Sequence, residues 1–274
     1  MNTIFAFVND TIVPVEAALL PIGDLGIQRG YGIFDFFRVN GIKPLFIQDH
    51  LDRFFNSAAL MRLKTNYSRI EIEAIIHQLV QKNNLAHSGL KILLTGGDAE
   101  DGYTVSSPRL SIVQQELKPP PMELPENGIR LVTREYQRQL SDVKTTDYLM
   151  AIWLQDWMKS MQADDILYCH NGWIRECPRS NFFIISNEDV LLTPATDMLK
   201  GITRKNIINT SDKLGISLEI RDVHINELKS AKGAFICSST KRIMPVYQVD
   251  QFEYNISLCS PVLNQLWNEL ITME

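Results

Sequence analysis

The sequence lacks the cysteine arrangements that indicate a metal site. Its four cysteines, Cys169, Cys177, Cys237 and Cys259, include no pair with C-x-x-C spacing. A zinc site is therefore not indicated, and we expect no metal ion. Free cysteine is among the most often buried residue types, so we expect four buried thiols in a reducing compartment.

Long apolar runs and an excess of positive charge are also absent. No apolar run approaches the ~20 residues that a membrane-spanning helix needs. Residues 1–5 lack a basic region and a long apolar core, so no signal peptide is predicted and we expect a cytoplasmic protein. The net charge of −5 argues against a nucleic-acid-binding protein, which usually carries a basic face.

One segment divides the 274-residue chain. Residues 118–125 contain four prolines within seven positions, which neither a helix nor a central strand tolerates. We therefore predict a stiff proline-rich linker over residues 118–128. It separates a smaller N-terminal domain, residues 1–117, from a larger C-terminal domain, residues 129–274.

Hydrophobic patterning predicts both strands and helices in each half. The predicted strands cover residues 4–8, 34–39, 91–95, 110–114, 129–133, 166–169, 182–185, 190–193 and 234–237. The predicted helices begin at the N-caps Asp49 and Ser68 in the first half, and cover residues 147–161, 203–214 and 261–271 in the second. The pattern indicates a mixed α/β (α+β) fold of two domains, with a ligand pocket expected between them.

Lys144 and Glu176 are the candidates for covalent and acid–base chemistry. A lysine desolvated between packed elements has a lowered pKa and can attack an aldehyde. The alternative is an ordinary solvated lysine. Glu176 could keep a pyridinium nitrogen protonated, or it could form an ion pair with Arg175 or Arg179.

Two turns could bind a phosphate group. Gly201-Ile202-Thr203-Arg204 opens a helix, where backbone N–H groups and the helix dipole favour anions. The alternative is that Gly201 and Thr203 only shape and cap the helix. Ser238-Ser239-Thr240 follows a strand and is a second candidate turn. A lysine, a carboxylate and two such turns suggest pyridoxal phosphate, held as a Schiff base.

Taken together, the segments resemble the class IV aminotransferase family, whose members are fold-type IV pyridoxal-phosphate enzymes. The resemblance covers nearly the whole chain. It rests on Arg29-Gly30-Tyr31-Gly32-Ile33-Phe34-Asp35, His50-x-x-Arg53-x-x-x-Ser57, Lys144, Glu176-x-x-x-Ser180-Asn181, Gly201-Ile202-Thr203-Arg204 and Ser239-Thr240.

The resemblance implies a role for each matching residue. Lys144 would hold the cofactor and then move a proton between substrate and cofactor, and Glu176 would bond the pyridine nitrogen. The remaining cofactor-binding residues implied are Arg53, Leu199, Ile202, Thr203, Ser239 and Thr240. The resemblance also implies a homodimer with the active site between the two domains.

The family resemblance leaves the substrate open. Leu94-Thr95-Gly96-Gly97 stands where many D-amino-acid aminotransferases carry a carboxylate-binding arginine, and Asp147 replaces an asparagine usual in aminodeoxychorismate lyases. Arg29 and Arg179 are the candidates to bind a substrate carboxylate, and Lys91 is a third candidate cation. Tyr31, close to Arg29 in the sequence, is a further candidate substrate-binding residue.

The pattern is most similar to a less usual group of D-amino-acid aminotransferases. We therefore expect transfer of an amino group between a D-amino acid and a 2-oxo acid. The alternatives are an aminodeoxychorismate lyase, which eliminates pyruvate, and a branched-chain L-amino-acid aminotransferase.

Overall fold

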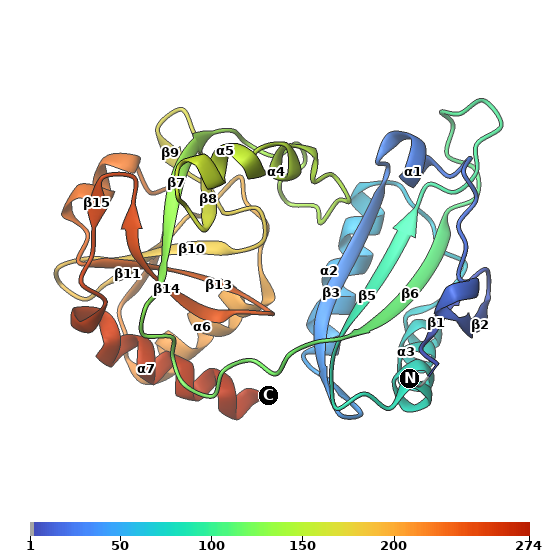
Figure 1. Cartoon of the computed structure of the whole chain (residues 1–274), viewed down its shortest axis with the longest axis horizontal. Coiled ribbons are helices and arrows are strands. Elements are labelled where there is room, and N and C mark those ends of the chain that lie inside the picture. The colour runs from blue at the N-terminus through green and yellow to red at the C-terminus, as the bar shows by residue number, and fades with distance from the viewer. Residues whose placement is uncertain (1–2) are drawn as a thin grey trace. The chain divides into compact units, whose positions relative to one another are not determined.

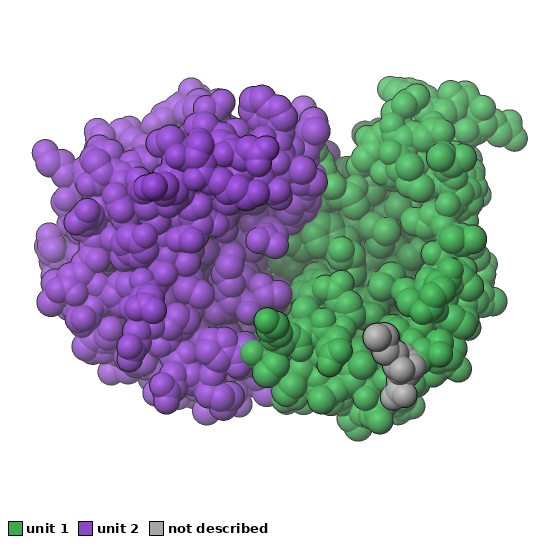
Figure 2. Space-filling model, viewed as in Figure 1, with its two compact units in different colours: residues 1–119, 143–147 green, residues 120–142, 148–274 purple. Residues whose placement is uncertain are grey.

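The computed structural model describes residues 3–274 and divides into two compact units (Figures 1 and 2). The first unit comprises residues up to Pro119 together with Val143–Asp147. The second comprises Pro120–Asp142 and Tyr148–Glu274, so the division falls within the run of prolines. Lys144 thus packs with the first unit, although it follows the prolines in sequence.

The first unit is built on a six-stranded sheet in which every strand pairs antiparallel to its neighbours. The spatial order is β2-β1-β6-β5-β3-β4. The strands are β1 (Phe5–Val8), β2 (Thr11–Pro14), β3 (Gly32–Asn40), β4 (Lys43–Pro44), β5 (His87–Thr95) and β6 (Arg109–Glu116). The four strands predicted in this half are all present.

Helices cover one face of this sheet, as Figure 1 shows for α2 (Ile47–Leu60) and α3 (Arg69–Asn83). A short helix, α1 (Leu25–Arg29), and a 3-10 turn, η1 (Val15–Ala17), complete the unit. Alternate residues of β3 are buried with the helices, among them Ile33 and Phe37. Because side chains alternate between the two faces of a strand, Phe34 and Phe36 point to the other face, where they are half-buried.

The start of one helix in this unit was predicted correctly and the other was not. Ser68 caps α3 with Glu71 in a capping box, as the sequence predicts. The prediction that Asp49 caps α2 is wrong, because the N-cap is Phe46 and Asp49 lies in the first turn. Phe46 has a φ of 54° and no side-chain oxygen, so the sequence carries no capping signal there.

The second unit contains a nine-stranded mixed sheet, in the order β12-β11-β10-β13-β14-β7-β8-β9 with β15 beside β14. Most neighbours are antiparallel, but β7 runs parallel to β8 and β14, and β11 parallel to β12. The strands are β7 (Ile129–Glu135), β8 (Asp165–His170), β9 (Trp173–Ile174), β10 (Asn181–Ile185), β11 (Leu191–Thr193), β12 (Leu218–Ile220), β13 (Gly233–Ser238), β14 (Arg242–Val249) and β15 (Phe252–Glu253).

The centre of this sheet is buried on both faces. Phe183 and Ile185 of β10 pack in the core shared with α6 (Ile202–Leu214) and α7 (Ile256–Met273). Phe182 and Ile184 pack in a second core on the opposite face, which includes Leu228 of the 3-10 helix η2 (Ile225–Ser230). The sequence of a strand that is buried on both faces is a continuous apolar run, and this is why β10 could be predicted from the sequence.

Two helix predictions for this unit need correction, and one strand was missed. The helix predicted over residues 147–161 is divided at Leu154 into α4 (Leu149–Trp153) and α5 (Gln155–Ser160). The last helix begins at Ile256 with Asn255 as its cap, so Pro261 lies inside it rather than at its start. Strand β14 was not predicted, because it contains Pro245.

The two sheets, with helices packed on them, confirm the predicted mixed α/β fold class. Within residues 3–274, no helix is long and apolar enough to cross a membrane.

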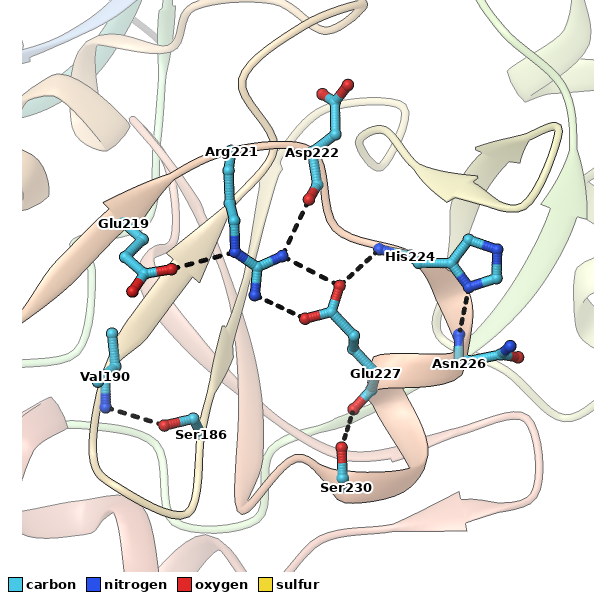
Figure 3. Close-up of polar contacts among 9 residues, drawn as sticks. All are labelled: Ser186, Val190, Glu219, Arg221, Asp222, His224, Asn226, Glu227 and Ser230. Atoms are coloured by element: carbon cyan, nitrogen blue, oxygen red, sulfur yellow. Dashed lines mark hydrogen bonds and ion pairs between the residues drawn. The ribbon is translucent and has the colours of Figure 1, made fainter.

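An ion-pair network ties η2 to strand β12 in the second unit (Figure 3). The Arg221 guanidinium donates to both carboxylate oxygens of Glu227, at 3.0 and 2.7 Å, and to Glu219 at 3.1 Å. Glu227 also accepts from the backbone N–H of His224 at 2.8 Å. The hydrogen bond from Arg221 is the main cause that lowers the pKa of Glu227.

We expect Glu227→Gln to lower the free energy of unfolding by up to about 1 kcal/mol at pH 7, because the ion pair is partly exposed. A lowered folded-state pKa stabilises the protein above the unfolded-state value of about 4.3, and this stabilisation is lost as the pH falls through the folded-state value. Denaturant titrations at several pH values measure the difference. The difference in unfolding free energy between Glu227→Gln and the wild type should shrink below about pH 4. The control Glu253→Gln, at an exposed site, should show no difference from the wild type. A difference that does not change with pH would contradict this assignment.

Candidate functional site

The candidate site residues fall into two groups, one in each unit. The first unit carries Lys144 and Arg53, and the second carries Glu176 and the two turns at Gly201 and Ser238 that are candidates to bind a phosphate. Each group is described within its own unit.

Strand pairing fixes the backbone of Lys144 in the first unit. The carbonyl oxygen of Lys144 accepts from the N–H of Phe34 at 2.9 Å, and the N–H of Thr146 donates to Gly32 at 2.9 Å. The N–H of Lys144 donates to the Ser57 hydroxyl at 3.3 Å. The half-buried side chain places its amine 4.6 Å from the centre of the Phe34 ring, a cation–π distance.

Arg53 is held by a buried carboxylate. Asp35 of β3 points to the helix-covered face, where its oxygens accept from Nε and Nη2 of Arg53, both at 2.8 Å. Within residues 3–274, Nη1 of Arg53 has no hydrogen-bond partner. A guanidinium held in this way is pre-oriented to bind an anion.

His50 completes this group, with its Nδ1 2.6 Å from Asp35. Burial lowers the pKa of His50, so the ring is neutral near pH 7 and its Nδ1–H donates to the carboxylate. Burial by itself would raise the pKa of Asp35, but the charge and hydrogen bonds of Arg53 lower it well below its usual range. Asp35 is therefore an anion that orients Arg53.

Glu176 is buried in the second unit, just after β9, and both of its carboxylate oxygens have partners. Oε1 accepts from Nε of Arg138 at 2.7 Å, and Oε2 accepts from the backbone N–H of Leu199 at 3.0 Å. Arg138 also donates to the carbonyl oxygen of Ser141 at 2.7 Å. These contacts hold the carboxylate in one orientation.

Arg138 was not among the partners expected for Glu176. The sequence suggests Arg175 or Arg179 instead, but Arg175 pairs with Asp197 at 3.1 Å. Arg138 lies 38 residues before Glu176 within a polar stretch, residues 134–139, and nothing in that stretch distinguishes one side chain from the next.

The two candidate turns, at Gly201 and at Ser238, lie at the same edge of the sheet in the second unit. Gly201, the N-cap of α6, makes no side-chain capping bond, and a Cβ at this position would clash with Oδ1 of Asn181. Asn181 in turn donates to the carbonyl oxygen of Leu199 at 2.7 Å. Asn181 begins β10 opposite Cys237 of β13, so the turn that follows Ser238 lies at the same edge.

This edge suits an anion. The first amides of α6, those of Ile202 and Thr203, belong to a helix N-terminus that no side chain caps. Hydroxyl groups of the neighbouring turn supply further donors, with the Ser238 and Thr240 oxygens 3.4 Å apart. The chemistry of this donor set therefore fits the phosphate of a cofactor.

The candidate substrate-binding residues have more open surroundings. Arg29 is exposed and is the last residue of helix α1. Tyr31 is half-buried and donates its hydroxyl to the carbonyl oxygen of Met61 at 2.6 Å. Arg179 is exposed, and so is Lys91, whose amine lies 5.7 Å from the centre of the Phe34 ring.

Comparison of the fold with solved structures identifies the class of protein. A branched-chain aminotransferase from Thermoproteus uzoniensis, solved with norvaline, shares the fold with a TM-score of 0.87 at 19% identity, over 98% of this chain and 95% of that one. A structure described as a putative 4-amino-4-deoxychorismate lyase from Legionella pneumophila has a TM-score of 0.85 at 27% identity, over 93% and 96% of the two chains. The protein is thus a fold-type IV enzyme.

The family follows from the sequence comparison. The family model "Amino-transferase class IV" matches residues 32–249, and the chain belongs to this family. The D-alanine aminotransferase of Listeria monocytogenes serotype 4b is 31% identical over 258 residues, which cover 89% of this chain and 86% of the relative. That of Listeria innocua is 29% identical over 279 residues, covering 96% and 94%. The resemblance seen in the sequence is confirmed.

The buried ion pair at Arg53 has a measurable role in stability. We expect Asp35→Asn to lower the free energy of unfolding by about 3 kcal/mol, because it leaves the guanidinium without its buried counter-charge. Denaturant titration at pH 7 measures the loss. The control Asp156→Asn removes a fully exposed carboxylate and should have almost no effect. An Asp35→Asn protein as stable as the wild type would contradict the role given to Asp35.

Proposed function

We propose that this protein is a pyridoxal-phosphate-dependent aminotransferase that moves an amino group between a D-amino acid and a 2-oxo acid. The observation that carries the proposal is Lys144, whose backbone is fixed to β3 and whose amine lies against Phe34, in a chain of the class IV family. A lysine held in this way, in partly apolar surroundings, suits attachment of an aldehyde.

The family resemblance gives several residues a part in holding the cofactor. Lys144 would bind its aldehyde carbon, and Glu176 would accept a hydrogen bond from its pyridine nitrogen. The side chain of Leu199 would pack against its ring. The phosphate would be bound by Arg53, the backbone amides of Ile202 and Thr203, and the hydroxyl groups of Ser239 and Thr240. The uncapped start of α6 and the pre-oriented guanidinium of Arg53 support this assignment.

When bound, pyridoxal phosphate supplies a carbonyl group that takes up the amino group and a ring that withdraws electrons from the substrate carbon. Glu176 would keep the pyridine nitrogen protonated, and Arg138, which donates to Oε1 of Glu176, would hold the carboxylate in position. The Lys144 amine would then carry a proton between the substrate Cα and C4′ of the cofactor.

Arg29 and Arg179 would bind the substrate α-carboxylate through bidentate hydrogen bonds. Both are exposed within the described chain and offer guanidinium groups to a ligand. We propose that Arg29 reaches the site of a partner subunit in a homodimer, and that Tyr31 helps to shape the substrate position. The D preference rests on the D-alanine aminotransferases to which the chain is similar.

An aminodeoxychorismate lyase is the second candidate. The similarity to the Legionella structure favours it, at 27% identity over almost the whole chain. The two activities differ in what happens to the substrate amino group. A transaminase leaves the amino group on the cofactor, and a 2-oxo acid must then remove it to regenerate the starting form of the enzyme. A branched-chain L-amino-acid aminotransferase is a third candidate, supported only by the shared fold.

A half-reaction screen separates these functions. We expect D-alanine or D-glutamate to bleach the absorption band of the lysine-bound cofactor, and pyruvate or 2-oxoglutarate to restore it. Stopped-flow absorbance of the holoenzyme measures both steps. Bleaching by L-leucine alone would overturn the D-amino-acid assignment. Release of pyruvate from aminodeoxychorismate, without bleaching by any amino acid, would establish the lyase instead.

The role of Arg179 can be tested by removing its guanidinium. We expect Arg179→Ala to lower kcat/KM for D-alanine by about 10- to 100-fold, which is the loss expected when a hydrogen bond between charged groups is removed. Arg179→Lys should recover only part of this loss, because an ammonium cannot form the two-pronged contact. The control Lys229→Ala removes an exposed charge on η2. Equal effects of Arg179→Ala and Lys229→Ala would contradict the assignment.

A further inference from the structure

A buried carboxylate lies directly before helix α1, the helix that ends at Arg29. Asp24 is fully buried and is the N-cap of α1. Its Oδ1 accepts from the backbone N–H of Gly26 at 2.7 Å, and its Oδ2 accepts from the Thr95 hydroxyl at 2.7 Å. Oδ2 also lies 3.6 Å from Nε of Arg109, which balances the charge of the carboxylate. Asp24 therefore joins α1 to the end of β5 and the start of β6.

Helix α1 fits closely against this end of the sheet. It has only five residues, too few for a helix that is stable by itself, so contacts within the unit determine its position. A Cβ on Gly26 would clash with the side chain of Thr95. The N–H of Leu25 donates to the carbonyl oxygen of Gly97 at 2.9 Å. The hydrogen bonds of Asp24 complete this attachment.

The guanidinium of Arg29 depends on the position of this helix. Within residues 3–274, its one hydrogen bond runs from Nη1 to the carbonyl oxygen of the neighbouring Gln28, at 3.1 Å. Arg53, by contrast, is held by the carboxylate of Asp35. A side chain without such an anchor is positioned only by its backbone, so a shift of α1 displaces the Arg29 guanidinium as well.

We propose that Asp24 is a positioning residue for Arg29, which it holds through α1 with the help of the Thr95 hydroxyl. The inference rests on the proposed function, in which Arg29 binds the substrate α-carboxylate. A bidentate contact between a guanidinium and a carboxylate depends strongly on geometry, so a displacement of about 1 Å weakens it. Asp24 and Thr95 thus act on substrate binding without touching the substrate.

The test removes the hydroxyl of Thr95 rather than Asp24 itself, because loss of Asp24 would also leave the buried Nε of Arg109 without its counter-charge. In steady-state assays of the holoenzyme with D-alanine, Thr95→Val should raise KM by about 10-fold and change kcat by less than about 2-fold. Thr95→Ser keeps the hydroxyl and should return KM to nearly the wild-type value.

A matched control separates positioning from a general loss of stability. Thr133→Val removes the same kind of hydrogen bond, from the Thr133 hydroxyl to Asp250 at 2.6 Å, in the second unit. It should lower stability as much as Thr95→Val and leave KM unchanged. Equal effects of the two substitutions on KM would contradict the role given to Asp24.

A double substitution shows whether Thr95 acts through Arg29. Arg29→Ala alone should raise KM for D-alanine by about 10- to 100-fold. Adding Thr95→Val to Arg29→Ala should then change KM by less than about 2-fold, because the guanidinium that would be displaced is absent. Effects that multiply would overturn the proposal, since Thr95 would then act on the substrate by another route. An unchanged KM in Arg29→Ala alone would instead contradict the proposed role of Arg29.

A further measurement does not depend on catalysis. Hydrogen–deuterium exchange reports how often the amides of α1 open. Thr95→Val should speed exchange by about 10-fold in the peptide that contains residues 24–31, whereas Thr133→Val should leave this peptide unchanged. Unchanged exchange in Thr95→Val would show that Asp24 and Thr95 do not hold α1. If the wild type reacts with no amino acid, the proposed function fails, and the exchange measurement still decides whether Asp24 and Thr95 hold α1.

Discussion

The backbone pairing between β3 and residues 143–147 fixes the position of Lys144, the proposed cofactor-binding lysine. Phe34 donates to the carbonyl oxygen of Lys144, so the lysine segment acts as a short extra strand beside β3. The same strand directs Phe34 to one face and Asp35 to the other. One face thus presents the Lys144 amine over an aromatic ring, while the opposite face anchors the guanidinium of Arg53.

In the second unit, a chain of polar contacts fixes the other half of the proposed chemistry. Arg138 and the backbone of Leu199 hold the two oxygens of Glu176, and Asn181 holds the next part of the Leu199 loop. The loop then enters α6 at Gly201, where a side chain would not fit. The orientation of the Glu176 carboxylate and the position of the uncapped start of α6 therefore depend on each other.

The sequence predicted the elements whose signals are local. Alternating or continuous apolar runs located nine strands, and Ser68 with Glu71 located the start of α3. Features decided by distant contacts were missed. Pro245 concealed β14, and Phe46 gives no capping signal at α2. A central proline and a cap without a side-chain oxygen are tolerated only because the surrounding packing holds them.

The candidate site shows the same division between local and distant signals. Motifs located Lys144, Glu176 and the turn at Gly201, because each is a short pattern in the sequence. Arg138 is recognised only through a partner 38 residues away, Glu176. Contacts between residues so far apart leave no periodic pattern in the sequence. The central claim remains that Lys144 is the residue that holds the cofactor.

That claim is tested most directly by trapping the lysine. The protein is loaded with pyridoxal phosphate, reduced with borohydride and digested, and peptide mass spectrometry locates the label. We expect a stable cofactor adduct on the peptide that contains Lys144, and no specific adduct in Lys144→Ala. A label on another lysine, or equal labelling of the wild type and Lys144→Ala, would contradict it.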